Sequence, residues 1–358
     1  MNAKSSYIKM FVLLIMVSFG ARANAVIINV LEWEGYISPF EAQFVAYAKS
    51  KGMDVKLNII EPFITGPDDT FKAMRAKKAD VTTPTNNYFK MNQGKLMQVL
   101  QPIDFSKLSN YHKVLGSLRS ATYDEDGKGK YSVPLLGGSY GLAYNADKVS
   151  APDSWNALWD PKFKGKYAIT DGQFEANVYI TMLALGYPPE TIYDISQGNF
   201  NAGEVQTKLS QLVANAGSFW GGMADANAMK NLDLVTTYWF GVAEANKSGQ
   251  NWKFANPKEG QTVWLDTMSI GAHVNGETLE ASYLLLDFMI SEVVQKQIIE
   301  MYGSIIVNGE TKSLLDAETI KAGRVGDESF FVDAYFWKPL SSRTRNMYKQ
   351  MWGKAQSK

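Results

Sequence analysis

Residue types that could bind a cationic ligand gather in four short segments of the chain. The segments are Glu32-Trp33-Glu34-Gly35-Tyr36, Trp264-Leu265-Asp266, Tyr238-Trp239, and Asp171 with Glu175 four residues later. An indole or phenol ring packs flat against methylene groups and attracts cations, by about 0.5–2 kcal/mol per contact. Carboxylates placed beside such rings neutralise ammonium groups. Together these residue types suit a polyamine, which is a flexible methylene chain that carries several ammonium groups.

Two alternative explanations of these aromatic and acidic segments remain. Tryptophan and tyrosine are also common in hydrophobic cores, so a single segment of this kind is better explained by packing than by ligand binding. A sugar-binding protein would use tryptophan platforms too, but with more neutral hydrogen-bonding side chains around them. The interpretation as an amine site therefore depends on where the segments lie in the fold.

Composition excludes several other classes of function. The 358 residues carry 36 basic and 36 acidic side chains, so nothing in the charge balance favours nucleic acid. Cysteine is absent and the two histidines, His112 and His273, are far apart, which leaves no metal-ligand spacing. The acidic segment Asp124–Gly127 departs from a calcium loop in the position of its glycine. We expect the protein to bind neither a metal ion nor a cofactor and not to be an enzyme. The remaining enzyme alternative is a pair of carboxylates that converge in the fold to cleave a glycoside.

The first 25 residues have the pattern of an export signal. Lys4 and Lys9 precede a short apolar run, which ends in the small-residue sequence Ala21-Arg-Ala-Asn-Ala25. The run is about half the roughly 20 residues that cross a bilayer. We expect residues 1–25 to be removed as a signal peptide and the mature protein to be periplasmic.

The mature chain alternates strand and helix patterns, which predicts an α/β fold. Strands are expected at 26–31, 54–60, 80–84, 167–170 and 234–238, and helices at 38–51, from Asp68 or Asp69 to 79, at 173–185 and at 241–247. The periodic stretch 277–302 predicts one long core helix in the first lobe.

Two lobes are expected, each an α/β sheet with its helices. We assign 26–138 plus 268–325 to lobe 1 and 139–267 plus 326–358 to lobe 2, with crossing segments near Gly138 and Thr267. In open α/β sheets ligands bind outside the carboxyl ends of the strands, where three of the four segments fall. If 263–266 is extended, Trp264 and Asp266 project to the same face, so one strand end supplies both a platform and an anchor.

Further motifs give the chain a family resemblance. They are Tyr131-Ser-Val-Pro134 with Gly138, Ser154-Trp-Asn-Ala-Leu-Trp159 leading to Phe163-Lys-Gly165, Thr170-Asp171, and Pro257-Lys-Glu-Gly260 leading to Trp264. With the strand that opens into Trp33 and Tyr36, they cover nearly the whole mature chain. The chain resembles the periplasmic polyamine-binding proteins of spermidine and putrescine importers. The resemblance implies the two-lobed periplasmic-binding-protein fold (type II), with a mixed sheet flanked by helices in each lobe and a ligand cleft between the lobes.

The resemblance also implies site residues and departures from the family pattern. The residues that it places against the ligand are Trp33, Tyr36, Thr85, Asn87, Glu175, Tyr238, Trp239, Trp264 and Asp266. A second acid of the family corresponds here to Gly172, and a late pocket tyrosine corresponds to Ser304. Glu34 or Glu32 could replace the missing carboxylate, a hypothesis that position alone motivates.

These departures make the chain similar to a sensor branch of the family, which reports norspermidine to a signalling protein in the membrane. We therefore expect a monomer that closes on a spermidine- or norspermidine-class polyamine and reports it to an inner-membrane signalling receptor. The alternative partner is the permease of a polyamine ABC importer, and a sugar-binding protein is the remaining alternative.

Overall fold

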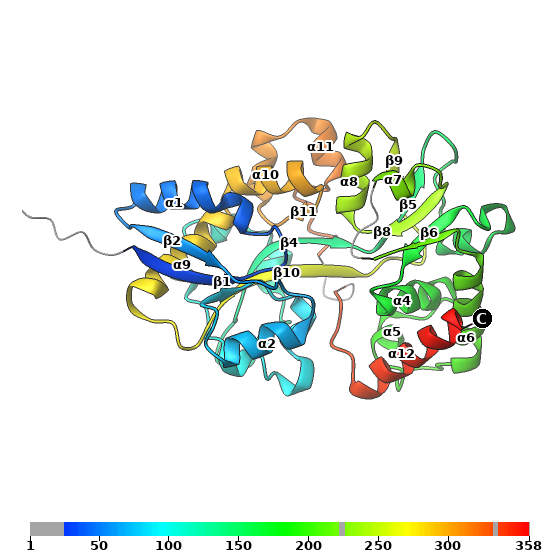
Figure 1. Ribbon diagram of the computed structural model, residues 1–358, viewed down its shortest axis with the longest axis horizontal. Helices are drawn as coiled ribbons and strands as arrows, with labels where there is room; N and C mark the ends of the chain where they lie inside the picture. Colours follow the sequence, from blue (N-terminus) through cyan, green and yellow to red (C-terminus); the bar gives the residue numbers. More distant parts are fainter. Residues whose placement is uncertain (1–24, 222–225, 332–335, 358) are drawn as a thin grey trace, which may run out of the picture.

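Two sheets form the framework of the computed structural model, which describes residues 25–221, 226–331 and 336–357. The first sheet has the strand order β11-β4-β10-β3-β1-β2 and the second the order β7-β6-β8-β5-β9. Figure 1 shows the two sheets side by side, each with its own helices; we call these parts the first and the second lobe. The predicted signal peptide lies outside the described residues except for Ala25.

The strands of both sheets are short except for the two that lie centrally between the lobes. Their bounds are β1 Val26–Leu31, β2 Val55–Ile59, β3 Val81–Thr82, β4 Val133–Ser139, β5 Gly141–Asn145, β6 Tyr167–Thr170, β7 Ser218–Trp220, β8 Leu234–Thr237, β9 Trp252–Phe254, β10 Val263–Ile270 and β11 Ile305–Ile306. In the first sheet β1 pairs in parallel with β2 and β3, whereas β10 is antiparallel to β3 and β4. The predicted α/β fold with a mixed sheet in each lobe is confirmed.

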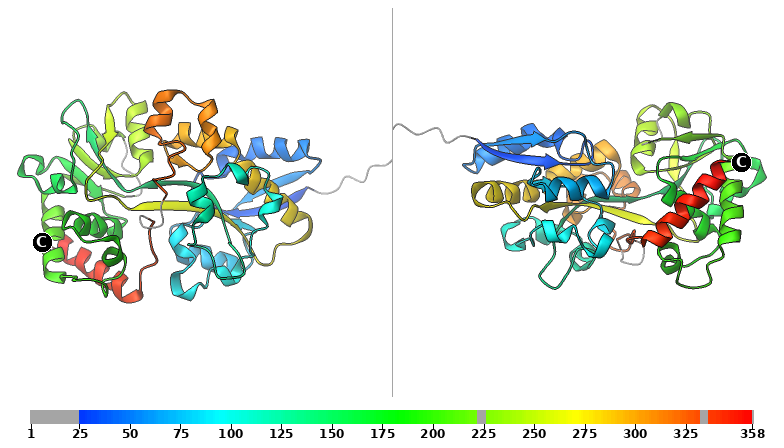
Figure 2. Two further views of the ribbon diagram at one scale, coloured as in Figure 1. Left: turned by 180° about the vertical axis from the view of Figure 1, so that it is seen from behind. Right: turned by 60° about the horizontal axis from the view of Figure 1, so that its bottom comes forward.

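Helices cover both faces of each sheet. Their bounds are α1 Glu41–Ser50, α2 Pro67–Arg75, α3 Gly116–Ser120, α4 Phe174–Ala184, α5 Pro189–Tyr193, α6 Ala202–Asn215, α7 Ala226–Met229, α8 Trp239–Lys247, α9 Gly276–Met289, α10 Glu292–Tyr302, α11 Ala317–Ala322 and α12 Ser342–Gln356. Figure 2 shows α12, in red, packed across the green helices of the second lobe, where it contacts α4 and α6. Helix α4 is buried nearly all round because the sheet, α6 and α12 enclose it, which explains its apolar sequence. Within the described residues no helix is long and apolar enough to cross a membrane.

The predicted long helix at 277–302 is wrong, because two helices, α9 and α10, occupy this stretch. The chain is extended at Ser291, and side chains from further along the chain bind the carbonyls that the end of α9 exposes. The Gln295 amide donates to the Met289 carbonyl at 3.1 Å, and the Asn308 amide donates to the Ile290 carbonyl at 2.8 Å. The apolar periodicity continues through the break, so sequence periodicity alone does not reveal it.

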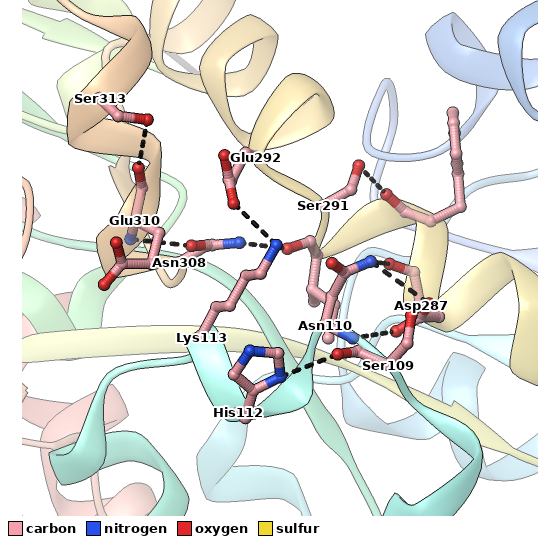
Figure 3. Close-up of polar contacts among 12 residues, drawn as sticks. Ser109, Asn110, His112, Lys113, Asp287, Ser291, Glu292, Asn308, Glu310 and Ser313 are labelled. Atoms are coloured by element: carbon pink, nitrogen blue, oxygen red, sulfur yellow. Dashed lines mark hydrogen bonds and ion pairs between the residues drawn. The ribbon is translucent and has the colours of Figure 1, made fainter.

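Figure 3 shows how a loop of the first lobe is fastened at this break. The buried carboxylate of Asp287 accepts hydrogen bonds from the Ser109 hydroxyl at 2.6 Å and from the Asn110 amide nitrogen at 2.7 Å. Lys113 forms an ion pair with Glu292 at 2.7 Å in the first turn of α10. The direction of α10 is thereby fixed, and α10 ends with Tyr302 beside the second lobe.

Helix α2 also differs from its prediction. It ends at Arg75 rather than at residue 79, and neither Asp68 nor Asp69 is its N-cap. The Asp69 carboxylate instead accepts hydrogen bonds from the Thr65 amide and hydroxyl, at 3.0 and 2.7 Å, in the turn before the helix. Pro67 at the first helical position sets the start, because its fixed φ suits that position.

The chain passes between the sheets where β4 ends and β5 begins, at Ser139 to Gly141. The return runs from the end of β9 at Phe254 to the start of β10 at Val263, so Thr267 lies inside a strand of the first sheet. The chain crosses a third time between α11 and α12. Residues 263–267, assigned to lobe 2 from the sequence, thus pair within the first sheet, and the exact lobe boundaries stay a prediction.

Gly138 allows the close approach of two strands at this crossing. It lies opposite Trp264 in the pairing of β4 with β10, and a Cβ added to Gly138 would lie 2.9 Å from the Trp264 ring. Real Cβ atoms essentially never come so close, so a side chain here would displace the indole. The glycine that the sequence singles out therefore lets β4 lie against the Trp264 platform.

Candidate functional site

Strand ends bring the predicted site residues to the junction of the two lobes. Trp33 and Tyr36 follow β1, and Thr85 follows β3, which is parallel to β1. In the second lobe Glu175 lies in the first turn of α4 after β6, and Tyr238 follows β8, which is parallel to β6. Because parallel strands end at the same edge, the segments from each lobe converge there.

A buried carboxylate, Asp266 on β10, is the centre of this convergence. Its side chain is 4% exposed and accepts hydrogen bonds from the Tyr36 hydroxyl at 2.7 Å and from Thr85 Oγ1 at 2.5 Å. The strand register shifts between Asp266 and Thr267, where Asp266 bridges to Thr85 instead of continuing the regular ladder. The three predicted residues Tyr36, Thr85 and Asp266 are thus brought into direct contact.

The electrostatic state of Asp266 is unusual for an aspartate. Burial raises its pKa from 3.8 to about 7, although the hydrogen bonds from Thr85 and Tyr36 oppose the shift. In the described part of the chain no Lys, Arg or His forms an ion pair with it. A buried carboxylate whose partners are only hydroxyls lacks the cation that would stabilise its charged form.

A group of aromatic rings from both lobes gathers around Trp264, two positions before Asp266 on β10. Tyr238 meets Trp264 edge to face, with ring centroids 6.1 Å apart, and Phe240 lies 5.9 Å from Trp264. Tyr302 packs edge to face on Phe240 at 5.8 Å, and its hydroxyl donates to the Gly35 carbonyl at 2.5 Å. Rings in this arrangement supply flat apolar surface and a negative face for a cation.

The remaining predicted rings lie beside this group. Trp239 begins α8 and lies 4.5 Å from Phe254, while both it and Trp264 abut the backbone of Gly138. Trp33 is half-buried, and its backbone N–H donates to Thr83 Oγ1 at 2.8 Å. Neither contact places a ring of Trp33 or Trp239 directly on Asp266, so their ligand contacts stay predictions.

Asn87 offers an acceptor that nothing in the described chain uses. Its Oδ1 is buried and has no hydrogen-bond partner among the described residues. The neighbouring Asn86 is structural instead, because its side chain bonds the Leu265 amide at 3.1 Å and the Trp337 carbonyl at 2.9 Å. An unpartnered buried carbonyl oxygen suits an ammonium, which only donates hydrogen bonds.

Sequence reasoning missed Tyr88 in the same loop. Tyr88 is half-buried, and its pKa lies well above its usual value, first because of burial and then because of the charge of Asp266. Glu175 also raises this pKa and Arg345 lowers it, so the phenol lies within electrostatic reach of groups from both lobes. The signal that could have found Tyr88 is its position directly after Asn87 in the loop matched to ligand contacts. Tyr302 was missed because it ends the stretch predicted as a core helix, and Phe240 because it is not among the residues that the resemblance places against the ligand.

In the second lobe Glu175 already has a basic partner. Arg345 of α12 lies 3.1 Å from it, measured from Nε to Oε1, and the Glu175 side chain is 23% exposed. Nearby, the Tyr238 hydroxyl donates to Gln173 Oε1, just before α4. The Glu175 carboxylate thus lies at the edge of the site and is already paired with the guanidinium of Arg345.

Glu32 and Glu34, proposed as replacements for the missing family acid, have different environments. Glu32 is fully buried, and its carboxylate accepts from the backbone amides of Ile37 and Ser38, where it caps a short helical turn. Glu34 is exposed. Only Glu34 therefore has a carboxylate free to turn toward a ligand, and its role stays a prediction.

Replacing Glu34 by Gln should weaken amine binding by a modest factor, about two- to fivefold, because an exposed carboxylate acts through a screened charge. Calorimetry with spermidine measures the effect, and Glu61→Gln, at another exposed acid of the first lobe, is the matched control. Equal affinities of the Glu34 variant, the control and the unmodified protein would remove Glu34 from the site.

A scan against protein families identifies the class of this protein. Residues 76–321 match the family of bacterial extracellular solute-binding proteins, and the chain belongs to this family. These are proteins that bind a solute rather than enzymes, in agreement with the sequence prediction. The predicted periplasmic location is likewise confirmed by the family and by its periplasmic relatives.

Particular relatives narrow the class further. The spermidine/putrescine-binding periplasmic protein of Salmonella typhimurium is 26% identical over 286 residues, which cover 74% of this chain and 78% of the relative. The putrescine-binding periplasmic protein SpuD of Pseudomonas aeruginosa is 23% identical over 94% of this chain and 93% of its own. The resemblance to polyamine-binding proteins deduced from the sequence is confirmed.

A solved structure shows the same fold. The substrate-binding protein PotD of a spermidine/putrescine ABC transporter from Streptococcus pneumoniae superposes with a TM-score of 0.74 at 20% identity, over 93% of this chain and 99% of that one. At this identity the likeness establishes the two-lobed fold, as predicted, and leaves the ligand to be argued from the site.

Proposed function

We propose that this protein is a periplasmic polyamine-binding protein that holds its ligand at the junction of the lobes. The observation that carries the proposal is Asp266, a buried carboxylate with a pKa of about 7 and no cation beside it in the described chain. An ammonium group supplies the missing charge, and the rings of Trp264 and Tyr238 pack against the methylenes of the ligand.

Multiple ammonium groups are favoured over one. Glu175, in the second lobe, is a second carboxylate at the edge of the site, and Asn87 offers an unpartnered acceptor in the first lobe. A ligand that reaches both lobes would bind the closed arrangement better than an open one and so shift the population toward closure. A neutral sugar would leave the charge of Asp266 unmatched, which disfavours the sugar-binding alternative.

A thermal-shift screen of the purified mature protein across diamines, triamines and tetramines tests the proposal. We expect stabilisation by at least one of these amines at micromolar concentration and none by neutral sugars. Absence of any response to amines would contradict the proposal.

The membrane partner is proposed separately. Kinship with binding proteins of importers supports delivery of the polyamine to an ABC permease. Gly172 and Ser304 replace an acid and a tyrosine of the importer family pattern. Because of these departures, a signalling receptor stays the predicted partner and norspermidine the predicted ligand. Deletion of the gene distinguishes the two partners. Loss of polyamine uptake would support a permease, and unchanged uptake with altered signalling would support a receptor.

Amine affinity should fall about tenfold between pH 8 and pH 6. An ammonium binds the ionised carboxylate, and with a pKa of about 7 only roughly one Asp266 in ten is ionised at pH 6. Below pH 7 binding must therefore release a proton, whereas the amine itself, with a pKa near that of lysine, stays charged throughout. Calorimetry at both pH values measures the effect, and Asp266→Asn should remove the pH dependence. A flat profile in the unmodified protein would show that Asp266 does not meet the amine.

A further inference from the structure

Arg345 holds a position that a ligand ammonium would be expected to take. It belongs to the first turns of α12, and its Nε lies 3.1 Å from Glu175 Oε1 in the first turn of α4. The guanidinium side chain is 52% exposed and the carboxylate 23% exposed. The pair therefore lies at an accessible edge of the site and not in the core of the second lobe.

The pair also lies within reach of the first lobe. The Tyr88 phenol interacts electrostatically with Asp266, with Glu175 and with Arg345. The segment that leads into α12 is tied to the same loop, because the Asn86 amide donates to the Trp337 carbonyl at 2.9 Å. Arg345 thus follows a segment anchored beside the site.

Its place in the helix is electrostatically unfavourable. Helix α12 begins with Ser341 as its N-cap, and its first turn has no acid, whereas Arg343 and Arg345 bring two cations there. Positive charge near a helix N-terminus opposes the helix dipole. Departures from such local rules are expected at functional positions, and here Glu175 supplies the compensating charge.

We propose that Arg345 is a specificity-determining residue, which occupies Glu175 as an internal substitute for a ligand ammonium. The inference rests on the proposed polyamine-binding function. A polyamine whose ammonium reaches Glu175 must displace Arg345 from the carboxylate and bind near its positive charge. An amine held at Asp266 alone leaves the pair intact.

The displacement has a moderate cost. Half-exposed ion pairs contribute little, and a nearby like charge adds to the penalty, so Arg345 should weaken the binding of a long polyamine by about three- to tenfold. The protein would thereby discriminate among polyamines by length, because only those long enough to reach Glu175 compete with Arg345.

The test is calorimetry with spermidine on Arg345→Gln and on its matched control Arg343→Gln. Arg343 is exposed two residues earlier in the same helix and interacts with Asp194, so its removal makes the same change in net charge away from Glu175. We expect about three- to tenfold tighter binding by the Arg345 variant, no more than a twofold change in the control, and near-unmodified affinity for Arg345→Lys.

A double-mutant cycle makes the inference specific. In a Glu175→Gln background no carboxylate remains to be released, so Arg345→Gln should tighten binding by no more than about twofold there, through removal of the like charge alone. An equal gain in the Arg343 control, an undiminished gain without Glu175, or weaker binding by Arg345→Gln would overturn the inference. If the unmodified protein and all variants ignore every amine, the polyamine function itself fails, a result distinct from these.

Discussion

Replacing Asp266 by Asn should lower polyamine affinity by on the order of 100-fold or more at pH 8. The substitution keeps the size of the side chain, and the Asn oxygen can accept from one of the two hydroxyls, of Tyr36 or Thr85, while its NH2 group donates to the other. It removes the charge that an ammonium needs. Leaving one partner of a buried ion pair uncompensated costs roughly 3 kcal/mol or more, and each 1.4 kcal/mol is tenfold in affinity. Calorimetry on the purified variant measures the loss.

The matched control for this experiment is Asp68→Asn. Asp68 is exposed at the start of α2, so its removal changes the net charge of the first lobe without touching the site. The control should bind as the unmodified protein does. A loss below about tenfold for Asp266→Asn would count strongly against Asp266 as the anchor.

The same substitution should stabilise the ligand-free protein at neutral pH. The pKa of Asp266 is 3.8 in its unperturbed state and about 7 in the folded protein, so the unfolded state releases this proton first as the pH rises. A raised folded-state pKa means that stability is lost between pH 3.8 and about 7, and the loss is complete above pH 7. The shift corresponds to at most roughly 4 kcal/mol, which Asn, having no proton to lose, would recover.

Thermal melting without ligand at pH 4.5 and at pH 8 checks this linkage. We expect the Asn variant to melt close to the unmodified protein at pH 4.5 and several degrees above it at pH 8. Saturating polyamine should reverse the order at pH 8, because only the aspartate protein gains stability from the ligand. An equal effect of the substitution at both pH values would show that Asp266 ionises in the folded protein as it does in the unfolded chain.

Together these two results would show that the empty binding site destabilises the folded protein and that bound polyamine removes this destabilisation. The buried Asp266 carboxylate is unfavourable alone, and the buried oxygen of Asn87 also lacks a partner in the described chain. A protein that is to close on a ligand benefits from such groups, because they make the filled site more favourable than the empty one.

The separate parts of this site were largely predictable from local sequence. The continuous apolar run at 26–31 predicts β1, and the aromatic and acidic residues that follow predict a strand end with a binding function. The argument that Trp264 and Asp266 share a face was conditional on an extended segment 263–266, and β10 supplies that segment. Each of these features depends on neighbours in the chain, so the sequence contains the needed information.

The errors arose where polar side-chain contacts decide the outcome and the apolar pattern carries no sign of them. The side chains of Gln295 and Asn308 bind the last carbonyls of α9 from 6 and 18 positions further along the chain, whereas the periodicity of 277–302 continues through the break. Tyr302 and Phe240 complete the group of rings around Trp264, and their contact with each other appears only when α10 and α8 meet.

Sequence alone determined that this chain is an exported α/β binding protein with rings and carboxylates in or just after its strands, because periodicity, composition and short motifs are local properties. The tertiary structure decided which carboxylate lacks a cationic partner. Asp266 and Glu175 look equivalent in the sequence, but one is buried among hydroxyls and the other is paired with Arg345, 170 positions away. Burial and long-range charge pairing depend on which segments meet in space, and local sequence patterns do not reveal which segments meet.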